Sequence, residues 1–371
     1  MKIAFISSAR NIHTIRWANA MSLRGHEVFV LSCAGDMPED QKFYDDKIRL
    51  IELKYQAPLG YYLNARKVKK LAKKEAFDIV NVHYASGYGT LGRMARLKHA
   101  LLNLWGSDVY LFPYSGRLQL SVIKKNLKYY QYIASTSYCM AEQARKFVKR
   151  DDIYITPFGV DTNLFKPISG LKDPDIILFG TVKALEKIYG IEDTVNAFIK
   201  LIHRLQREGK TELASKLRYH IYGKGDQKVA LQSLIDENGM TDIIKLCGYV
   251  KNNELPNVLN QFTVFCCTSH SESFGVAAVE AMACGIPVLV SDAEGFVEVV
   301  ENNVSGLIVP KHNIDAITDG MYQLLMDKDL RDSFGAAGIQ RAKKYYEWDQ
   351  NVQNMLEIYK KVSEDKQRQK E

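Results

Sequence analysis

The chain has 371 residues, of which 46% are hydrophobic and 25% charged, a balance typical of globular proteins that excludes a fibrous or disordered chain. This length exceeds the roughly 250–300 residues at which a single hydrophobic core stops growing, so we expect two domains. The net charge of +7 is uneven, because residues 1–165 hold 25 Lys and Arg against 14 Asp and Glu, whereas residues 166–371 hold 25 against 29.

The first half alternates apolar strands with helical segments. Strands are expected at residues 2–6, 28–31, 48–53, 78–82, 101–105, 132–135 and 153–155, with helices at 12–23, 61–74 and 118–128. Because most of these strands are apolar on both faces, helices should cover both sides of a parallel sheet. Residues 1–165 are therefore predicted to form a doubly wound, Rossmann-like α/β domain.

Glycine and proline interrupt the pattern at about residues 157–167, where we place the linker between domains. The alternation then restarts, with strands at 176–179, 219–222, 243–246, 264–267, 288–290 and 307–309 and helices at 191–207, 227–238, 275–284 and 313–326. A second Rossmann-like domain should span residues 170–340, and about the last 40 residues should form one continuous helix. Ligands of such sheets bind beyond the carboxyl ends of the strands, so a cleft between the domains is the expected site.

One segment of the second half has the features of a phosphate site. The strand at 264–267 is followed by the polar loop 270–273 and by a helix that begins near Gly275. The first amides of a helix have no intrahelical partner and its dipole favours negative charge, while a glycine lets the backbone approach a phosphate closely. Glu272 and Glu280 flank this start and can accept hydrogen bonds from sugar hydroxyls. The segment therefore suits a sugar nucleotide, although two solvated glutamates on a helix flank are the alternative.

The same segment resembles a known signature. His270-x-Glu272-Ser273-Phe274-Gly275, followed by Glu280-Ala281-Met282-Ala283-x-Gly285-x-Pro287-Val288, is similar to the E-x7-E motif of the family 4 glycosyltransferases. The resemblance continues at 24–28, 159–165 and 346–348. It implies a GT-B fold, in which two Rossmann-like domains face a cleft and the C-terminal helix, residues 341–371, crosses back to the first domain. It also implies a retaining, metal-independent hexosyltransferase whose first domain binds the acceptor and whose second binds the nucleotide sugar.

The resemblance assigns roles to single residues of the donor site. Glu272 would contact the donor sugar, the backbone around Phe274 and Gly275 would bind sugar and diphosphate, and Glu280 would bind the ribose. The neighbouring donor-binding candidates are Ser273 and Val276, and those that border the base are Gly223, Tyr249 and Val250.

Positive charge is needed to stabilise the departing nucleoside diphosphate. Lys187 matches the phosphate-binding lysine of the family. The arginine that usually follows the strand is replaced by Thr181, and Lys183 is the candidate for the second cation, placed about one helical turn before Lys187. The alternative is that Lys183 is a solvent-exposed lysine.

The first domain offers four further candidates. Ser8 and His13 lie on the acceptor side after the first strand, and His83 follows another strand as a catalytic candidate. Asp108 stands where many relatives have a catalytic histidine, so it either orients or deprotonates an acceptor hydroxyl or caps a helix.

These features predict transfer of a hexose or N-acetylhexosamine from a nucleotide diphosphate sugar to a growing, lipid-linked glycan in cell-surface polysaccharide synthesis. The D-x-D triplets at 173–175 and 327–329 are interpreted as surface charge, so neither a metal nor another cofactor is expected. The alternatives are a GT-B sugar-nucleotide epimerase or phosphorylase, and a catalytically silent nucleotide-sugar-binding protein. A dinucleotide dehydrogenase is disfavoured because no G-x-G-x-x-G follows the first strand.

The location is expected to be cytoplasmic, because the apolar run at residues 3–6 is far too short for a signal peptide and no run approaches the ~20 residues that span a bilayer. The basic helix at 61–74 has a narrow apolar stripe and predicts peripheral contact with the inner face of an anionic membrane. A solvated outer helix is the alternative. No nucleic-acid partner is expected.

Overall fold

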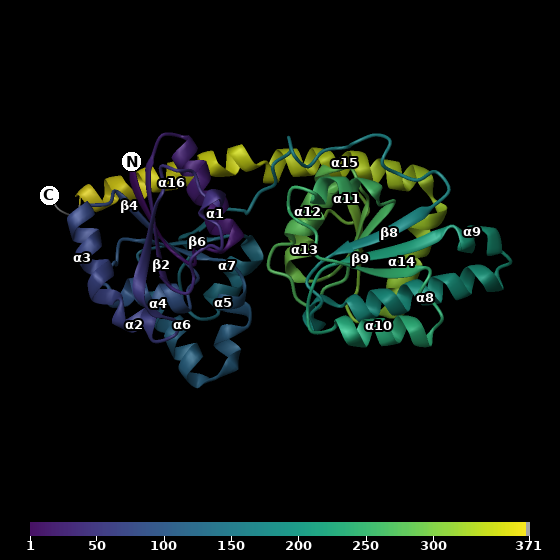
Figure 1. Cartoon of the computed structure of the whole chain (residues 1–371), viewed down its shortest axis with the longest axis horizontal. Helices are drawn as coiled ribbons and strands as arrows, with labels where there is room; N and C mark the ends of the chain where they lie inside the picture. The colour runs from purple at the N-terminus through teal and green to yellow at the C-terminus, as the bar shows by residue number, and fades with distance from the viewer. Residues whose placement is uncertain (369–371) are drawn as a thin grey trace. The chain divides into compact units, whose positions relative to one another are not determined.

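The computed structural model describes residues 1–368 and contains two compact units (Figure 1). The first unit comprises Met1–Phe158 and the chain from Asp349 onward, and the second comprises Gly159–Trp348. The division between the units thus lies at 158/159 and 348/349, where the sequence placed domain boundaries at 165/170 and 340/341. Each unit is a parallel sheet with its own hydrophobic core, which confirms the predicted α/β fold class.

The first unit contains a seven-stranded parallel sheet in the order β3-β2-β1-β4-β5-β6-β7. Its strands are β1 (Lys2–Ile6), β2 (Glu27–Ala34), β3 (Arg49–Gln56), β4 (Ile79–His83), β5 (Leu101–Leu104), β6 (Tyr132–Ser135) and β7 (Ile153–Ile155). Every residue of β4, β5 and β6 is buried, as expected for a sheet covered on both faces. The strand order reverses between β1 and β4.

The helices of this unit are more numerous than the sequence predicted. They are α1 (Ile12–Leu23), α2 (Gly60–Leu63), α3 (Ala65–Glu75), α4 (Gly87–Met94), α5 (Ser107–Tyr110), α6 (Arg117–Tyr129), α7 (Tyr138–Arg145) and α16 (Trp348–Arg368). The helix predicted at 61–74 is divided into α2 and α3 at Asn64. The Asn64 side chain bonds both backbone groups of Tyr55, accepting from its N–H at 3.2 Å and donating to its carbonyl at 2.8 Å.

Helix α3 does not present a free apolar face. Ala65 and Val68 are buried in the core of the first unit, and Leu71 and Ala72 pack against that core. Its basic residues are exposed, namely Arg66, Lys67, Lys69, Lys70, Lys73 and Lys74. The apolar stripe is therefore used in packing, and only the charge of the outer face is open to a partner. Among residues 1–368, no helix combines the length and apolar character that crossing a bilayer requires.

The second unit contains a six-stranded parallel sheet in the order β10-β9-β8-β11-β12-β13. Its strands are β8 (Ile177–Val182), β9 (Leu217–Tyr222), β10 (Ile244–Gly248), β11 (Val264–Cys267), β12 (Val288–Ser291) and β13 (Gly306–Val309). Its helices are α8 (Ile191–Arg207), α9 (Thr211–Ser215), α10 (Lys228–Glu237), α11 (Leu255–Gln261), α12 (Val276–Ala283), α13 (Glu294–Val299), α14 (Ile314–Met326) and α15 (Lys328–Tyr346). The strand order reverses between β8 and β11.

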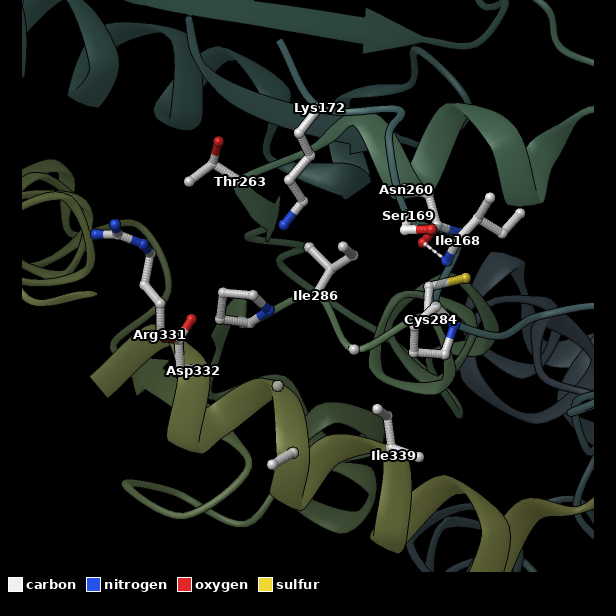
Figure 2. Close-up of a pocket in the computed structure, with 15 residues that line it drawn as sticks. Ile168, Ser169, Lys172, Asn260, Thr263, Cys284, Ile286, Arg331, Asp332 and Ile339 are labelled. Atoms are coloured by element: carbon white, nitrogen blue, oxygen red, sulfur yellow. Dashed lines mark hydrogen bonds between the residues drawn. The ribbon is translucent and has the colours of Figure 1, made fainter. Parts of the chain in front are cut away.

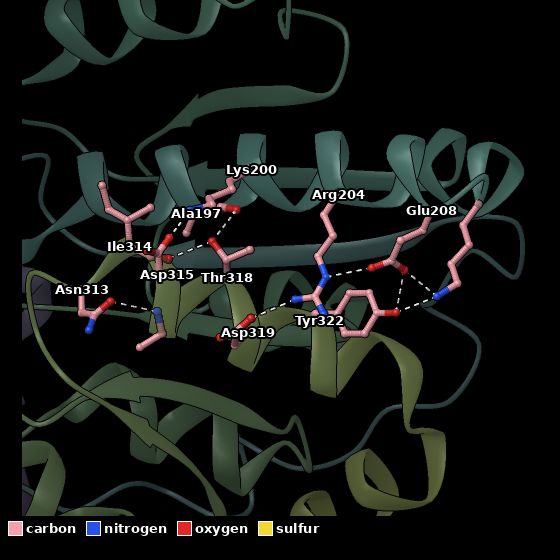
Figure 3. A network of polar contacts seen from close by, with 12 residues as sticks. Ala197, Lys200, Arg204, Glu208, Asn313, Ile314, Asp315, Thr318, Asp319 and Tyr322 are labelled. Carbon is pink, nitrogen blue, oxygen red and sulfur yellow. Dashed lines mark hydrogen bonds and ion pairs between the residues drawn. The ribbon is translucent and has the colours of Figure 1, made fainter.

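Helices α8 and α14 are joined along their length by polar contacts (Figure 3). The Thr318 hydroxyl donates to the Ala197 carbonyl at 3.2 Å inside the contact. At its edge, the Arg204 guanidinium pairs with Asp319 at 2.8 Å and lies 3.7 Å from the Tyr322 ring centroid. Exposed ion pairs add little stability. Together with the hydrogen bond of the buried Thr318 hydroxyl, they link α8 to α14.

The C-terminal segment, predicted as one continuous helix, is two helices separated at Glu347. Glu347 has extended backbone angles, φ −62° and ψ 131°, which end α15 before α16 begins. Val160 occupies the break, because its N–H donates to the Tyr346 carbonyl at 2.7 Å and its carbonyl accepts from the Trp348 N–H at 2.9 Å. From Asp349 onward, α16 belongs to the first unit, whereas the resemblance assigned residues 341–371 to it.

Helix α16 is fastened to the first sheet by a buried polar chain. The Asn81 amide of β4 donates to the Tyr359 hydroxyl, and the Asn103 amide of β5 donates to the Asn81 side-chain carbonyl. Tyr359 is fully buried. Near the end of α16, the Lys366 ammonium donates to the Phe77 carbonyl at 2.6 Å.

We expect Tyr359→Phe to lower the free energy of unfolding by about 1–3 kcal/mol, because it removes one partner of a buried hydrogen bond and leaves the Asn81 amide short of an acceptor. The matched control is Tyr345→Phe, which removes a hydroxyl from an exposed ring and should change the free energy by less than about 0.5 kcal/mol. Urea denaturation followed by circular dichroism measures both. Equal stability of the two variants would show that the Asn81–Tyr359 bond does not hold α16.

Candidate functional site

Most candidate residues lie at the carboxyl ends of strands, where each sheet reverses its strand order. Such reversal points are where ligands of open parallel sheets bind. In the second unit, Lys183 directly follows β8, and the loop that contains Glu272 follows β11. In the first unit, Ser7 directly follows β1 and His83 ends β4. The two reversal points therefore define one candidate site in each unit.

The loop after β11 is held in shape by its backbone. The Gly295 N–H donates to the Glu272 carbonyl at 2.8 Å, and a Cβ at Gly295 would lie 2.5 Å from the Phe274 nitrogen. Gly275, with φ +99°, is the N-cap of α12 and would bring a Cβ within 2.8 Å of Phe296. Two glycines are thus required for the loop to turn into the helix this tightly.

Phe274 anchors this loop with its side chain. The ring is 1% exposed and contacts the Tyr346 ring edge to face, with centroids 5.5 Å apart. Any contact of Phe274 with a ligand would therefore come from its backbone. The flanking Ser273 and Val276 are half-buried, and the N–H groups at the start of a helix such as α12 can bind an anion.

Lys183 and Glu272 form an ion pair that the sequence did not predict. The Lys183 Nζ lies 2.5 Å from a Glu272 carboxylate oxygen, and the two side chains are only 15% and 10% exposed. The ammonium also lies 4.5 Å from the Tyr189 ring centroid. Burial opposes the charged form of Lys183, but the Glu272 carboxylate outweighs it and raises the pKa of the lysine above its ordinary value. Lys183 is therefore a cation.

Lys183 is not on a helix, contrary to the placement from sequence. The following 3-10 helix begins only at Lys187 (Lys187–Tyr189), and Lys187 itself is exposed. The Lys183 N–H instead donates to the Tyr222 carbonyl at 2.9 Å, so the chain continues along β9. A Cβ at Gly223 would lie 1.8 Å from the Lys183 carbonyl oxygen. Gly223 therefore permits a close backbone approach that positions Lys183.

The remaining donor candidates lie on α12 and directly after β10. Glu280 is in the second turn of α12 and is 7% exposed. Tyr249 follows β10, is 64% exposed and has the Lys224 ammonium 5.1 Å from its ring centroid. Val250 is half-buried beside it. An exposed aromatic ring at a strand end is a suitable surface for a planar base.

The candidate site of the first unit contains two neutral histidines. His83 Nδ1 lies 3.0 Å from the Ser7 hydroxyl, and its ring packs on Trp105 at 3.9 Å between centroids. Burial, with a smaller effect from His13, holds the pKa of His83 well below its usual range. Burial and then the charge of Arg16 lower the pKa of His13 to about 3. Both imidazoles are therefore uncharged at neutral pH, and the same burial makes them weak bases.

His13 and Ser8 lie near the start of α1. The His13 ring stacks on Phe158 with centroids 3.9 Å apart. The backbone N–H of His13 donates to the Asn11 side chain, which caps α1. Ser8 is half-buried, and its carbonyl accepts from the Asn11 N–H at 3.3 Å.

Asp108 organises the backbone of two loops. Its carboxylate is 1% exposed and accepts from the N–H groups of Ala85 at 2.7 Å, Gly106 at 2.9 Å and Trp105 at 3.2 Å. Burial raises the pKa of Asp108, and these amide bonds oppose the rise. Asp108 is inside α5, so it is not the helix N-cap; it joins the loops after β4 and β5.

A second buried chain in this unit was not anticipated. The Tyr88 hydroxyl donates to Asp36 at 2.7 Å and accepts from the Cys33 N–H at 3.1 Å, next to Ser32. Burial raises the pKa of Tyr88 far above its usual range. Tyr88 and Asp36 are far apart in the sequence, so no local pattern indicates their contact.

Both D-x-D triplets have local structural roles. The Asp327 carboxylate accepts from the Leu330 N–H at 2.8 Å and caps α15. The Asp173 carboxylate accepts from the Asp175 N–H at 2.9 Å within an exposed turn.

A pocket of about 410 Å³ lies at the other end of the second sheet (Figure 2). Its lining includes Thr263 and Pro287, which immediately precede β11 and β12, together with Lys172 and Arg331. Ligands of parallel sheets bind at the carboxyl ends of strands. Because this pocket is at the amino ends, we do not assign it to the candidate site.

Two family models match the chain. One, described as glycosyl transferases group 1, matches residues 163–341, and the other, described as glycosyl transferase 4-like, matches residues 2–137. One similar protein is the N-acetyl-alpha-D-glucosaminyl L-malate synthase of Bacillus anthracis, 23% identical over 316 residues that cover 81% of this chain and 79% of that protein. Another is the GDP-mannose-dependent alpha-(1-6)-phosphatidylinositol monomannoside mannosyltransferase of Mycobacterium tuberculosis, 28% identical over 58% of this chain and 57% of that protein.

Solved structures of similar fold cover nearly the whole chain. Sucrose-phosphate synthase of Thermosynechococcus elongatus has a TM-score of 0.84 at 20% identity and covers 98% of this chain and 99% of its own. HepE of Anabaena in complex with UDP has a TM-score of 0.81 at 16% identity, with coverage of 97% and 100%. At these identities the likeness establishes the fold. With the two family models spanning most of the sequence, the chain belongs to the family 4 glycosyltransferases and has the GT-B fold.

Proposed function

We propose that this glycosyltransferase moves a hexose or N-acetylhexosamine, with retention, from a nucleotide diphosphate sugar to a hydroxyl of a growing, lipid-linked glycan in cell-surface polysaccharide synthesis. The observation that carries the proposal is the largely buried Lys183–Glu272 pair at the strand-order reversal of the second sheet, next to the start of α12. Solved structures of HepE with UDP and with UDP-glucose support a nucleotide-sugar donor.

The proposed donor pose follows from the charges of the second unit. The diphosphate lies at the start of α12, where the amides of Phe274 and Gly275 donate to it. Lys183 and Lys187 offset the charge that develops on the leaving diphosphate, so the transfer step needs no metal at the reacting atoms. Glu280 accepts from the ribose hydroxyls, and the base lies near Gly223, Tyr249 and Val250.

The ion pair makes donor binding an exchange of partners. Without donor, the charge of Lys183 is compensated by Glu272. A diphosphate carries more negative charge than a carboxylate, so it draws Lys183 toward the phosphate and frees Glu272 to accept from the hydroxyls of the sugar. The Lys183 ammonium thus pairs with Glu272 before the donor binds and with the diphosphate afterwards. Neither Lys183 nor Glu272 is left buried without a partner.

Retention is proposed to follow from attack on the same face as the leaving group. The bond between the anomeric carbon and the diphosphate oxygen breaks, the acceptor oxygen bonds to that carbon, and the departing phosphate takes the acceptor proton. Glu272 stabilises the sugar and forms no covalent bond, consistent with its pairing to a lysine. His83, Ser8 and His13 are the proposed acceptor-side groups in the first unit, with Asp108 as a positioning residue for the loops beside them.

The alternative functions differ in the co-substrate that they require and in whether they turn over the donor. An epimerase would convert the donor without an acceptor, a phosphorylase would require inorganic phosphate, and a silent binding protein would hold the donor without turnover. Calorimetric screening of UDP-, GDP- and ADP-sugars, followed by acceptor trials with the donor that binds, separates these cases.

The catalytic assignment predicts that Glu272→Gln and Lys183→Met each lower kcat/KM for donor by about 100- to 1000-fold, since each removes charge that stabilises the transition state. Glu280→Gln should mainly raise the donor KM, because ribose contacts are equal in ground and transition states. The control is Glu237→Gln on the exposed end of α10, which should leave both constants unchanged. Nucleotide release is the assay. Wild-type rates for folded Glu272→Gln and Lys183→Met would refute the assignment.

The ion pair also predicts coupling in stability without donor. In a double-mutant cycle of Lys183→Met and Glu272→Gln, we expect a coupling free energy of about 1–3 kcal/mol in urea denaturation, because each single change leaves the other group buried and unpaired. The control cycle uses Lys328→Met and Asp332→Asn, whose side chains are 74% and 64% exposed, and should give no more than about 0.5 kcal/mol. Equal coupling free energies in the two cycles would show that burial does not strengthen the Lys183–Glu272 ion pair.

Membrane contact is proposed through the exposed basic face of α3. The chain should sediment with phosphatidylserine vesicles at low salt and be released at high salt, but should not sediment with phosphatidylcholine vesicles. Replacing Lys67 and Lys70 by Gln should weaken binding roughly 30-fold, at about 1 kcal/mol for each lysine. The matched control replaces Lys343 and Lys344 on α15. Equal loss in both double variants, or no sedimentation of the wild type, would contradict a role for α3.

A further inference from the structure

Three potential metal ligands from three segments of the second unit converge beside the candidate donor loop. Asp193 is in the first turn of α8, His270 is in the loop after β11, and His312 is in the turn between β13 and α14. His270 Nε2 lies 2.8 Å from one carboxylate oxygen of Asp193, and His312 Nδ1 lies 3.9 Å from the same oxygen. The ligand atoms of all three residues are within 4.8 Å of one another.

A hydrogen bond accounts for only part of this arrangement. The contact between His270 and Asp193 has hydrogen-bond length, but 3.9 Å between His312 and the same oxygen is too long for one. A bound cation would satisfy both imidazoles and the carboxylate. Two ligands of a tetrahedral metal with bonds near 2.1 Å lie about 3.4 Å apart, and the two observed separations lie on either side of that value.

We propose that Asp193, His270 and His312 bind a divalent transition metal of the Zn²⁺ type. Two imidazole nitrogens and one carboxylate oxygen are a ligand set that such ions prefer, whereas Mg²⁺ and Ca²⁺ favour oxygen ligands alone. The carboxylate supplies negative charge, and the His312 side chain, 62% exposed, leaves an entry path and room for water as a fourth ligand.

The backbone around the cluster holds the ligands in register. The His270 N–H donates to the Ile188 carbonyl at 2.8 Å. At Gly190, just before α8, a Cβ would lie 2.2 Å from the Thr268 carbonyl oxygen and 3.0 Å from His270 Nε2, so only a glycine lets the loop approach the helix. The His270 and His312 rings lie 3.7 Å apart between centroids, and His312 adopts a left-handed φ of +60°. Such support by neighbouring groups is what orients metal ligands in proteins.

The metal would connect the loop that contains Glu272 to both α8 and α14. His270 is two residues before Glu272, so fixing its imidazole restricts the loop that contains this carboxylate. Helices α8 and α14 are already joined by the contacts of Figure 3. The ion is thus a brace for the loop, distinct from the metal-free transfer proposed above and independent of it.

The test uses the full chain after treatment with a chelator and dialysis. Calorimetric titration with Zn²⁺ alone should show one site, titration with Co²⁺ should produce the visible absorption of a tetrahedral complex, and Zn²⁺ should raise the unfolding temperature. His312→Asn should weaken Zn²⁺ binding at least about tenfold and abolish the Co²⁺ absorption. Asparagine is chosen because it tolerates positive φ. The control is His203→Asn on the exposed face of α8, which should bind like the wild type.

A second variant, Asp193→Asn, keeps the size of the side chain and should also lose affinity, which guards against misfolding of His312→Asn. Absence of a Zn²⁺ site in the wild type, or equal affinity in the wild type and both cluster variants, would overturn the proposal. No nucleotide sugar is present in these measurements. Their result therefore stands whether or not the donor-release assays support the proposed transfer.

Discussion

The reversal of strand order in each parallel sheet is the constraint on which the arrangement of functional groups depends. Between β8 and β11 the connections leave in opposite directions, so the loops after these two strands face each other without a crossing helix between them. Lys183 and Glu272 occupy those loops and meet as a buried ion pair. The equivalent position in the first unit brings Ser7 to His83. The strand order thus determines which loops, and therefore which functional side chains, lie close together.

Close backbone approaches determine how sharply these loops can turn. Gly223 lets the chain after β9 pass the Lys183 carbonyl, Gly295 makes room for the loop at Glu272, and Gly190 admits His270 to the start of α8. The side chains of Phe274 and Asp108 then fix the backbone from the inside, one by burying a ring and the other by accepting three amide hydrogen bonds. The groups free to meet a ligand are therefore carried on loops that have little freedom to move.

Periodicity and turn residues predicted the strands of both sheets, because buried parallel strands and glycine-terminated helices have strong local patterns. The strand at 132–135 and the helix at 191–207 match β6 and α8. The break at Glu347 was missed because nothing in its neighbours' helical preference reveals that Val160 pairs there. The Lys183–Glu272 pair, the Tyr88–Asp36 bond and the Asp193–His270–His312 cluster were also missed. Each joins residues distant in sequence, and their proximity exists only once the strands are ordered.

The docking of α16 has a consequence for synthesis of the chain. Tyr359, Met355 and Val362 are buried in the first unit, and Asn81 in the middle of its sheet bonds the Tyr359 hydroxyl. The strands of that unit leave the ribosome before the second unit, and the helix that covers them leaves after it. Domains ordinarily fold in order of synthesis. Here the second unit, whose residues are contiguous, can complete its core before the first unit has its last helix. Until α16 arrives, the first sheet exposes an apolar surface that must be kept from aggregating.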